Sequence, residues 1–275
     1  MDRIGIEFLS VFGMPPVDFV NLAADLGCHY ISTGLTSVPY DPPTYPPFSL
    51  RDDAALRREM VAAMRDRGVS ISLGEGMLVR NGADVRGLAT DLAIMAELGV
   101  GRINTVSFDA EFTRSVDQFG VLAEMAAAAG METTMEFGPG LSVPDLPTAL
   151  DAVRSVDRTD FRLLIDTMHL VRSGSSADDL VVLDPAVIGY VQLSDVPLVS
   201  SYPTYMEEAM FNRMVPGTGE LPLLDILAAL PRDLVIGLEI PLRVEAEAGV
   251  GPEARVGRCV DATRRLLAQL DDEAG

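Results

Sequence analysis

Short apolar segments alternate with longer amphipathic segments from one end of the chain to the other. Each apolar segment has the length of a strand, and most lack a clean alternation of apolar and polar positions. This pattern is typical of strands that are buried on both faces. It predicts eight strands, at residues 4–9, 30–33, 69–73, 102–106, 132–137, 162–166, 188–193 and 235–240.

The segments between these strands are rich in Ala and Leu, and their apolar residues recur at helical spacing. They predict helices at 17–26, 53–67, 85–98, 116–129, 146–156, 221–230 and 253–270, with only a short helix near 177–180. The alternation is typical of parallel α/β folds, and 275 residues is near the usual length of one TIM barrel. We therefore predict a single (β/α)8 TIM barrel over residues 1–275. A doubly wound sheet is the alternative, but no GxGxxG motif follows the first strand.

The composition narrows the possible functions. The chain carries 41 acidic against 21 basic residues, a net charge of −20, which repels phosphate backbones and anionic membranes. Nucleic acid and membrane are therefore not expected as partners. All 21 basic residues are Arg, so mechanisms that need a lysine, such as Schiff-base or pyridoxal-phosphate catalysis, are excluded. We see no signal peptide and no apolar run of membrane-spanning length, and we expect a cytoplasmic protein with two reduced thiols, Cys28 and Cys259.

Three carboxylates and one amide come at or near the ends of the last four predicted strands. Glu136 and Asp166 end the fifth and sixth strands. Gln192 lies in the seventh, and Glu239 is near the end of the eighth. A single acidic residue at a strand end is usually a cap or a loop residue, but the strand ends of a TIM barrel meet at one mouth. Three carboxylates gathered there repel one another unless protons or a hard divalent cation neutralise them.

Four short motifs, taken in order, resemble those of the xylose-isomerase-like superfamily of TIM barrels, which contains sugar isomerases and epimerases. The resemblance covers essentially the whole chain and implies a divalent metal bound at the ends of strands five to eight. The motifs are D-T-M-H at 166–169, V-Q-L-S-D at 191–195, Arg213 followed by P-G-T-G-E at 216–220, and G-L-E-I-P at 237–241.

The resemblance assigns the metal to four residues, Glu136, Asp166, Gln192 and Glu239. The family normally has His in the third position, where this chain has Gln192. An amide oxygen suits Mg²⁺ or Mn²⁺ and is a poor zinc ligand. We therefore expect one Mn²⁺ or Mg²⁺ ion as the cofactor, with zinc less favoured.

The resemblance also implies catalytic and substrate-binding roles. Glu136 and Glu239 would act as an acid/base pair on either side of the substrate. His169 would bind a substrate oxygen or shuttle a proton, although a packed structural histidine is the alternative. Arg213 and Asp195 are expected to bind the substrate, Arg213 through a carboxylate or phosphate, with a solvent-exposed Arg as the alternative.

The leading functional hypothesis is a metal-dependent isomerase or epimerase of a keto sugar or related polyol, acting through proton abstraction next to a carbonyl and a metal-stabilised enediolate. Gln192 resembles the equivalent residue of some 3-dehydroshikimate dehydratases, so a lyase that acts on a keto acid is the main alternative. An abasic-site endonuclease is disfavoured by the two His residues and the negative charge. A catalytically inactive binding barrel is the fourth hypothesis, and the sequence leaves the oligomeric state open, a homo-oligomer included.

Further residues are expected near the predicted barrel mouth. The Pro-rich segment 39–47 follows the second strand, where loops of a barrel serve as lids. Four polar residues follow earlier strands and are candidates for the pocket without an assigned role: Glu7, Glu75, Ser107 and Asp109.

Overall fold

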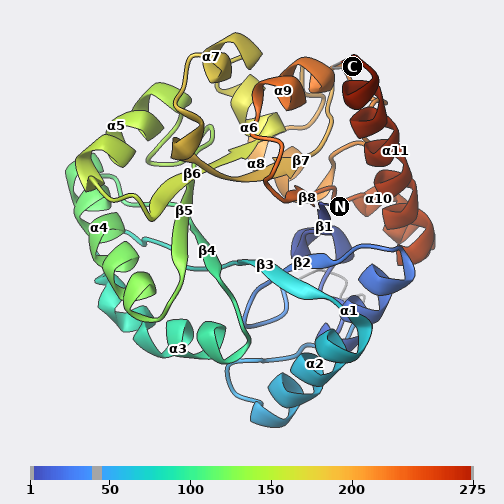
Figure 1. The fold of residues 1–275 in the computed structure, drawn as a ribbon, viewed down its shortest axis with the longest axis horizontal. Helices are drawn as coiled ribbons and strands as arrows, with labels where there is room; N and C mark the ends of the chain where they lie inside the picture. The colour runs from blue at the N-terminus through green and yellow to red at the C-terminus, as the bar shows by residue number, and fades with distance from the viewer. Residues whose placement is uncertain (1–2, 39–44, 274–275) are drawn as a thin grey trace.

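Eight parallel strands close into one barrel in the computed structural model, which describes residues 3–38 and 45–273. Each strand pairs with the next along the chain, and β8 pairs with β1 (Figure 1). The predicted (β/α)8 class is confirmed. The strands are β1 (Ile4–Ile6), β2 (Tyr30–Thr33), β3 (Ser70–Gly74), β4 (Arg102–Thr105), β5 (Glu132–Glu136), β6 (Phe161–Asp166), β7 (Ile188–Leu193) and β8 (Ile236–Leu238).

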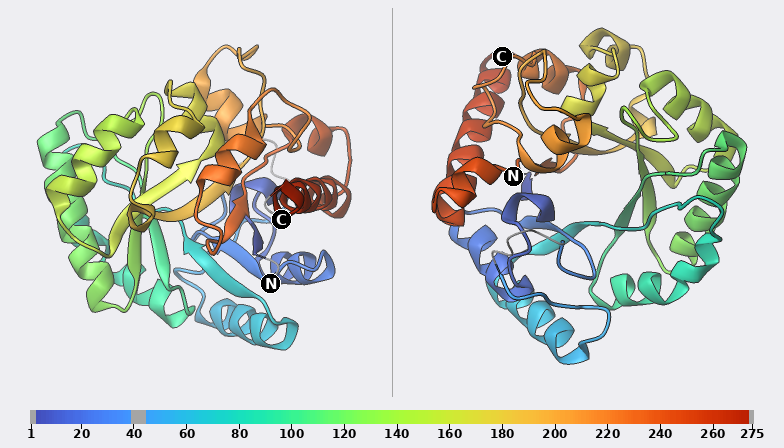
Figure 2. Two further views of the ribbon diagram at one scale, coloured as in Figure 1. Left: turned by 45° about the horizontal axis from the view of Figure 1, so that its top comes forward. Right: turned by 180° about the vertical axis from the view of Figure 1, so that it is seen from behind.

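Helices surround the barrel in every view (Figures 1 and 2). Seven of them lie at segments where helical spacing predicts a helix: α1 (Pro16–Asp25), α2 (Ala54–Arg67), α3 (Ala89–Glu97), α4 (Phe112–Ala128), α5 (Leu146–Val156), α9 (Leu223–Ala229) and α11 (Pro252–Glu273). The others are short: η1 (Phe8–Val11), η2 (Val85–Leu88), α6 (Thr167–Arg172), α7 (Ala177–Val181), η3 (Pro185–Val187), α8 (Tyr205–Phe211) and α10 (Arg243–Glu247). The sequence pattern indicates the short α7 but misses α6, α8 and α10, because so few residues show a helical period only weakly.

Local sequence explains where a typical helix begins and ends. The Asp53 side chain accepts hydrogen bonds from the backbone nitrogens of Ala55 and Leu56, and so caps the start of α2. Gly68 ends the same helix with φ at 68°, a left-handed conformation that glycine adopts without strain. Between these ends the helix buries Met60 and Met64, so its remaining positions are free to be polar.

Two apolar clusters hold the barrel together. The larger lies between the sheet and the surrounding helices. The smaller joins Leu73, Leu164 and Tyr190, which come from β3, β6 and β7 and can meet only inside the barrel. The Tyr190 hydroxyl lies 2.8 Å from Ser72 Oγ and donates to Glu7 Oε1, also at 2.8 Å. The barrel interior is thus a packed core with polar anchors, as TIM barrels require.

The strand register brings the predicted site residues to one level. Asp166 on β6 pairs with Gln192 on β7, and Gln192 pairs with Gly237 on β8. Glu239 follows one residue after β8, where its backbone nitrogen donates to Leu193 O at 3.2 Å. The strand ends therefore form a common rim, and that rim carries the site.

Three further expectations concern the chain as a whole. Cys28 and Cys259 are both buried and form no disulfide with each other, as expected for reduced thiols. Within residues 3–38 and 45–273, no helix combines the length and apolar character needed to cross a membrane. Most of the expected lid, residues 39–44, lies outside the described residues.

Candidate active site

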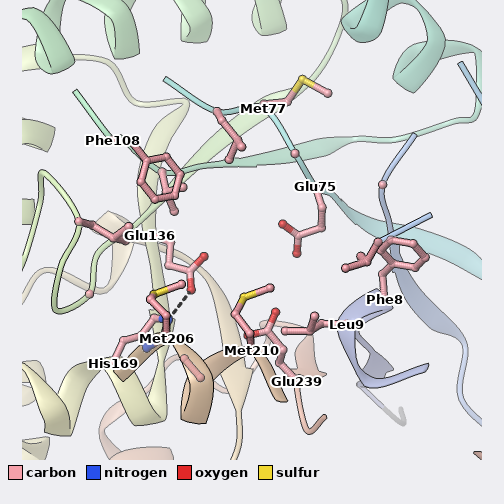
Figure 3. A pocket seen from close by; sticks show the side chains of 18 of the residues that line it. Phe8, Leu9, Glu75, Met77, Phe108, Glu136, His169, Met206, Met210 and Glu239 are labelled. Atoms are coloured by element: carbon pink, nitrogen blue, oxygen red, sulfur yellow. Dashed lines mark ion pairs between the residues drawn. The ribbon is translucent and has the colours of Figure 1, made fainter. Parts of the chain in front are cut away.

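A cavity of about 540 Å³ opens at the carboxyl ends of the strands. Glu75, Glu136 and Glu239 point into it from different sides (Figure 3). Its walls are largely apolar, with contributions from Phe8, Leu9, Met77, Phe108, Met206 and Met210. The cavity therefore combines an acidic floor with walls that suit an apolar molecular surface.

Glu136 is the last residue of β5. One of its carboxylate oxygens accepts a hydrogen bond from a neighbouring strand, and the other faces His169. Asn104 on the neighbouring β4 donates from Nδ2 to Glu136 Oε2 at 2.8 Å. Glu136 Oε1 lies 3.1 Å from Nε2 of His169. Because the amide of Asn104 fixes the carboxylate plane, Oε1 has a defined direction toward the cavity and the histidine.

Asp166 is buried at the junction of β6 and α6. Its Oδ1 accepts the backbone N–H of His169 at 3.0 Å and so caps the helix. Its Oδ2 forms an ion pair with Nη1 of Arg213. Burial by itself raises the pKa of Asp166, but the charge of Arg213, the nearby His169 and the hydrogen bonds from both residues together outweigh that effect, and the pKa is lowered. Asp166 therefore stays ionised.

Arg213 is a buried cation that joins two of the predicted metal ligands. Besides Asp166, its Nη2 contacts Glu239 Oε2 at 2.6 Å, and its Nε donates to Ala209 O at 2.8 Å. Its side chain is only 2% exposed. Burial lowers the pKa of Arg213, but the two carboxylates raise it more, so the guanidinium stays charged. All three nitrogens contact protein groups, which supports a positioning role. Arg213 also lines the cavity, so its expected contact with a substrate anion stays a prediction.

Gln192 and Glu239 form the remaining part of the floor. Gln192 is fully buried, and its Nε2 lies 3.3 Å from Glu239 Oε1 and 3.4 Å from Glu75 Oε1. Among the described residues, its amide oxygen has no hydrogen-bond partner. Burial raises the pKa of Glu239 well above its usual value; the charge of Arg213 lowers this pKa in part, and the charges of Glu136 and Asp166 raise it. Glu239 thus takes up a proton more readily than Asp166 does.

His169 lies between Glu136 and a tyrosine that the sequence analysis did not single out. The hydroxyl of Tyr205, the first residue of α8, lies 2.5 Å from His169 Nδ1. Burial raises the pKa of Tyr205, and the charge of Asp166 raises it further, so the hydroxyl stays protonated. Tyr205 belongs to a long connection after β7 and has no sequence motif around it, so only its place in space reveals the contact.

The donor set fits a divalent cation. One carboxylate oxygen of Glu136, one of Asp166 and a ring nitrogen of His169 all lie within 4.8 Å of one another. This group overlaps the expected ligand set in Glu136 and Asp166, and replaces Gln192 and Glu239 by His169. The unpartnered amide oxygen of Gln192 is a further buried acceptor at the same floor. Carboxylate, amide and imidazole groups are all accepted by Mn²⁺, and the oxygens alone suit Mg²⁺.

Asp195 has a different position from the one expected of a substrate ligand. It is 1% exposed, and its carboxylate accepts four backbone N–H groups, from Val196, Gly217, Gly219 and Leu221, at 2.8 to 3.1 Å. These bonds hold the P-G-T-G turn at 216–219 against the end of β7. The geometry therefore supports a structural role for Asp195 and does not support substrate contact.

Of the four further pocket candidates, one lines the cavity and three have structural contacts away from it. Glu75 lines the cavity, whereas Glu7 lies below it inside the barrel. Ser107 contacts Ser115 Oγ at 2.7 Å, and Asp109 forms an ion pair with Arg114. Both are buried and serve the loop after β4.

The match to a family model identifies the class of the protein. Residues 20–259 match the family described as xylose isomerase-like TIM barrel. The chain therefore belongs to that family, in agreement with the resemblance that its motifs show.

Individual relatives are more distant. A 3-dehydroshikimate dehydratase from Pseudomonas aeruginosa is 28% identical over 181 residues, which cover 63% of this chain and 28% of that protein. Thus the aligned part is less than a third of the length of that relative. Among solved structures, the IOLI protein with a bound zinc atom superposes with a TM-score of 0.79 at 17% identity, over 98% of this chain and 99% of that one. A D-psicose 3-epimerase from Clostridium cellulolyticum H10 gives 0.72 at 16% identity, over 97% and 99%. At such identities the two structures show the fold alone.

Proposed function

We propose that the protein is a metal-dependent lyase that removes water from a cyclic hydroxy-keto acid of the 3-dehydroshikimate type. The observation that carries this proposal is the floor of the cavity, where Glu136, Asp166 and Glu239 surround His169 and Arg213 within hydrogen-bond distances. Such a cluster suits the removal of a proton next to a carbonyl group and the stabilisation of the resulting negative charge.

Three observations favour the lyase over the isomerase that ranked first from the sequence. One relative, 28% identical over 181 residues, is a 3-dehydroshikimate dehydratase. Gln192 takes the position where the sugar epimerases of the family have His. The apolar walls formed by Phe8, Met77 and Phe108 suit the face of a carbon ring better than an open-chain polyol, whose hydroxyl groups need polar partners.

Glu136, Asp166, Gln192 and Glu239 would hold one divalent cation, with Mn²⁺ or Mg²⁺ favoured. When bound, the cation supplies Lewis-acid polarisation of the substrate carbonyl. Arg213 orients Asp166 and Glu239 by binding one oxygen of each. Asn104 does the same for Glu136. These contacts leave the remaining oxygens in fixed directions, as a preorganised site requires.

The chain's own groups then account for the proton transfers. A carboxylate, Glu239 in this proposal, accepts the proton from the carbon next to the carbonyl. The electron pair of that C–H bond forms a carbon–carbon double bond as the β-hydroxyl leaves. The departing β-hydroxyl takes up the proton that Glu239 removed and leaves as water, which restores the carboxylate. Nε2 of His169, beside Glu136, donates a hydrogen bond to the departing oxygen.

A sugar isomerase or epimerase is the second candidate. It is favoured by one feature, the presence of two carboxylates, Glu136 and Glu239, that face the same cavity (Figure 3). Such a pair can remove a proton from one side of a carbon atom and return it to another position or to the other side. The first step is the same in both candidates, so they differ only in the fate of the enolate.

The two candidates are distinguished by the product. The purified protein, treated with EDTA and reloaded with Mn²⁺ or Mg²⁺, is incubated with 3-dehydroshikimate and, separately, with D-psicose. A new conjugated ultraviolet absorbance in the first incubation supports the lyase. Exchange between sugar isomers, seen by chromatography, without that absorbance supports the isomerase. Absence of both products would contradict the proposed chemistry.

Variants connect the product to the site. Glu136→Gln and Glu239→Gln keep the size of each side chain but remove its charge. Each is expected to lower kcat by at least 100-fold, because the removed group transfers a proton or holds the cation. Glu59→Gln, an exposed change on α2, is the matched control and is expected to leave turnover unchanged. Near-normal turnover in both site variants would argue strongly against the assigned roles.

A further inference from the structure

The histidine of the site has a different partner on each ring nitrogen. Nε2 lies 3.1 Å from Oε1 of Glu136, and Nδ1 lies 2.5 Å from the hydroxyl of Tyr205. The ring is 8% exposed at the residue level, and Asp166 Oδ1, at 3.8 Å from Nδ1, is too distant for a hydrogen bond. Each nitrogen therefore has one close polar neighbour among the described side chains.

The nature of these neighbours fixes the tautomer of the ring. A carboxylate oxygen accepts hydrogen bonds, so the contact of Glu136 Oε1 with Nε2 at 3.1 Å places a proton on Nε2. In the neutral imidazole the other nitrogen, Nδ1, then carries a lone pair and must accept. Tyr205 supplies the donor, because a tyrosine hydroxyl carries a proton and lies 2.5 Å from Nδ1.

Packing holds the two rings in this arrangement. The ring centroids of His169 and Tyr205 are 5.7 Å apart. On the other side, a Cβ at Gly138 would come within 3.2 Å of the imidazole, so the lack of a side chain there gives the ring its space. The imidazole is thus confined between α8 and the loop after β5.

Helix α8 is fixed in the position that delivers the tyrosine. Glu208, one of its buried residues, binds Nη2 of Arg172 on α6 with both oxygens, at 2.9 and 2.8 Å. Thr204 caps its first turn through the backbone nitrogen of Glu207 at 3.2 Å. The ion pair joins α8 to the helix that carries His169, and so helps to fix the position of Tyr205 relative to His169.

We propose that Tyr205 is a positioning residue that donates its hydroxyl proton to Nδ1 of His169, and so holds this ring as the Nε2–H tautomer directed at Glu136. The consequence for the reaction rests on the proposed function. In that tautomer Nε2–H is the proton-bearing group that faces the cavity. The hydrogen bond from Tyr205 keeps the unprotonated Nδ1 turned away from the substrate.

The tautomer can be measured without any turnover. The chain has only two histidines, so a long-range ¹H–¹⁵N correlation spectrum of the ¹⁵N-histidine-labelled protein, with diamagnetic Mg²⁺ present, contains two ring systems. His29→Gln removes one of them and assigns His169. We expect the wild-type His169 ring to show a protonated Nε2 and a hydrogen-bonded, unprotonated Nδ1. We expect Tyr205→Phe to shift the Nδ1 resonance and to leave His29 unchanged.

Tyr202→Phe is the matched control, because it removes a hydroxyl from the same connection without touching His169. It is expected to leave both ring systems as they are. In kinetic assays Tyr205→Phe should lower kcat by roughly 10-fold or more, as is usual for the loss of a partner that orients a reactive histidine, while KM changes little.

Three results would each overturn the proposal: a protonated Nδ1 in the wild-type ring of His169, a metal-bound nitrogen in that ring, or a His169 spectrum that Tyr205→Phe leaves unchanged. A wrong proposed function would give a different result. The wild-type protein would then form neither product, but its histidine spectrum would still show the Nε2–H tautomer. The spectrum therefore decides the role of Tyr205 independently of the reaction.

Discussion

Nη2 of Arg213 lies 2.6 Å from Oε2 of Glu239, in a buried ion pair at the floor of the cavity. The arginine comes from an irregular segment, yet two backbone contacts fix it. Its own nitrogen donates to Pro241 O at 3.2 Å, and the next residue, Met214, forms an antiparallel bridge with Asp195. The chain thus places one permanent cation inside an acidic mouth, at a distance that orders two carboxylates.

Replacement of Arg213 by an uncharged residue should destabilise the protein. In Arg213→Met, Asp166 and Glu239 lose their partner while staying buried, and the loss of one member of a buried ion pair typically costs about 3–5 kcal/mol. The measurement is urea unfolding of the metal-free protein. Arg65→Met, which removes an exposed pair with Asp66, is the control and should cost less than about 1 kcal/mol. Equal effects of the two changes would show that Arg213 does not stabilise the floor.

Gly237 is expected to tolerate no side chain. A Cβ at this position on β8 would lie 1.6 Å from Oε1 of Glu7, whose carboxylate occupies that space. Glu7 is itself held by Tyr190 and is fully buried, so it cannot move away cheaply. Gly237→Ala should therefore cost at least about 3 kcal/mol or prevent folding. The soluble yield and the melting temperature measure this.

Gly101→Ala is the control for that substitution. Nothing lies within 4 Å of a Cβ built there, and its φ is not in the left-handed region. It should change the melting temperature by less than about 2 °C. A well-folded Gly237→Ala protein would mean that Glu7 does not occupy the barrel interior as described.

Asp195 should matter for stability more than for substrate affinity. In Asp195→Asn, one carboxylate oxygen becomes an NH₂ group that faces backbone N–H donors, and at least one buried donor loses its acceptor. Such a loss typically costs about 1–3 kcal/mol. The expected result is a lower melting temperature with KM changed less than about threefold, because the side chain holds the turn at 216–219 and does not reach the cavity. Asp225→Asn, an exposed change on α9, is the control, and a large rise in KM alone would restore the substrate-binding role.

The acidic cavity predicts an unusual dependence of stability on pH. Burial raises the pKa of Glu75 well above its usual value, and the charges of Glu7 and Glu239 raise it further. A carboxyl group with a raised pKa binds more protons in the folded than in the unfolded protein, so its contribution is present at low pH and is lost as pH rises through the folded pKa. The metal-free protein should therefore lose stability from about pH 4.5 upward through this group.

Glu75→Gln removes this effect. In EDTA it should raise the melting temperature at pH 8 by roughly 2–4 °C, as expected for about 1 kcal/mol of relieved repulsion. At pH 4.5 or below the two proteins should differ much less, because Glu75 is then protonated. Thermal melts at both pH values, with Glu59→Gln as control, measure the difference. A Glu75→Gln protein that is less stable at pH 8 would contradict the raised pKa.

The sequence determines the barrel and the set of acidic residues at its mouth. Strand and helix follow from local apolar patterns, since burial on both faces of a parallel sheet removes polar residues from each strand. Glu136, Asp166 and Glu239 could be located because a barrel brings all its strand ends together.

The contacts that decide what these residues do come only from the tertiary structure. Asp195 binds the turn at 216–219, Arg213 lies between two carboxylates, and Tyr205 reaches His169 from a helix of seven residues. The residues of each contact lie in separate segments, and their meeting depends on how long, aperiodic connections pack over the barrel. Periodicity carries information about a residue's own strand or helix, but none about its partner across the cavity, and so these roles appear only in the folded chain.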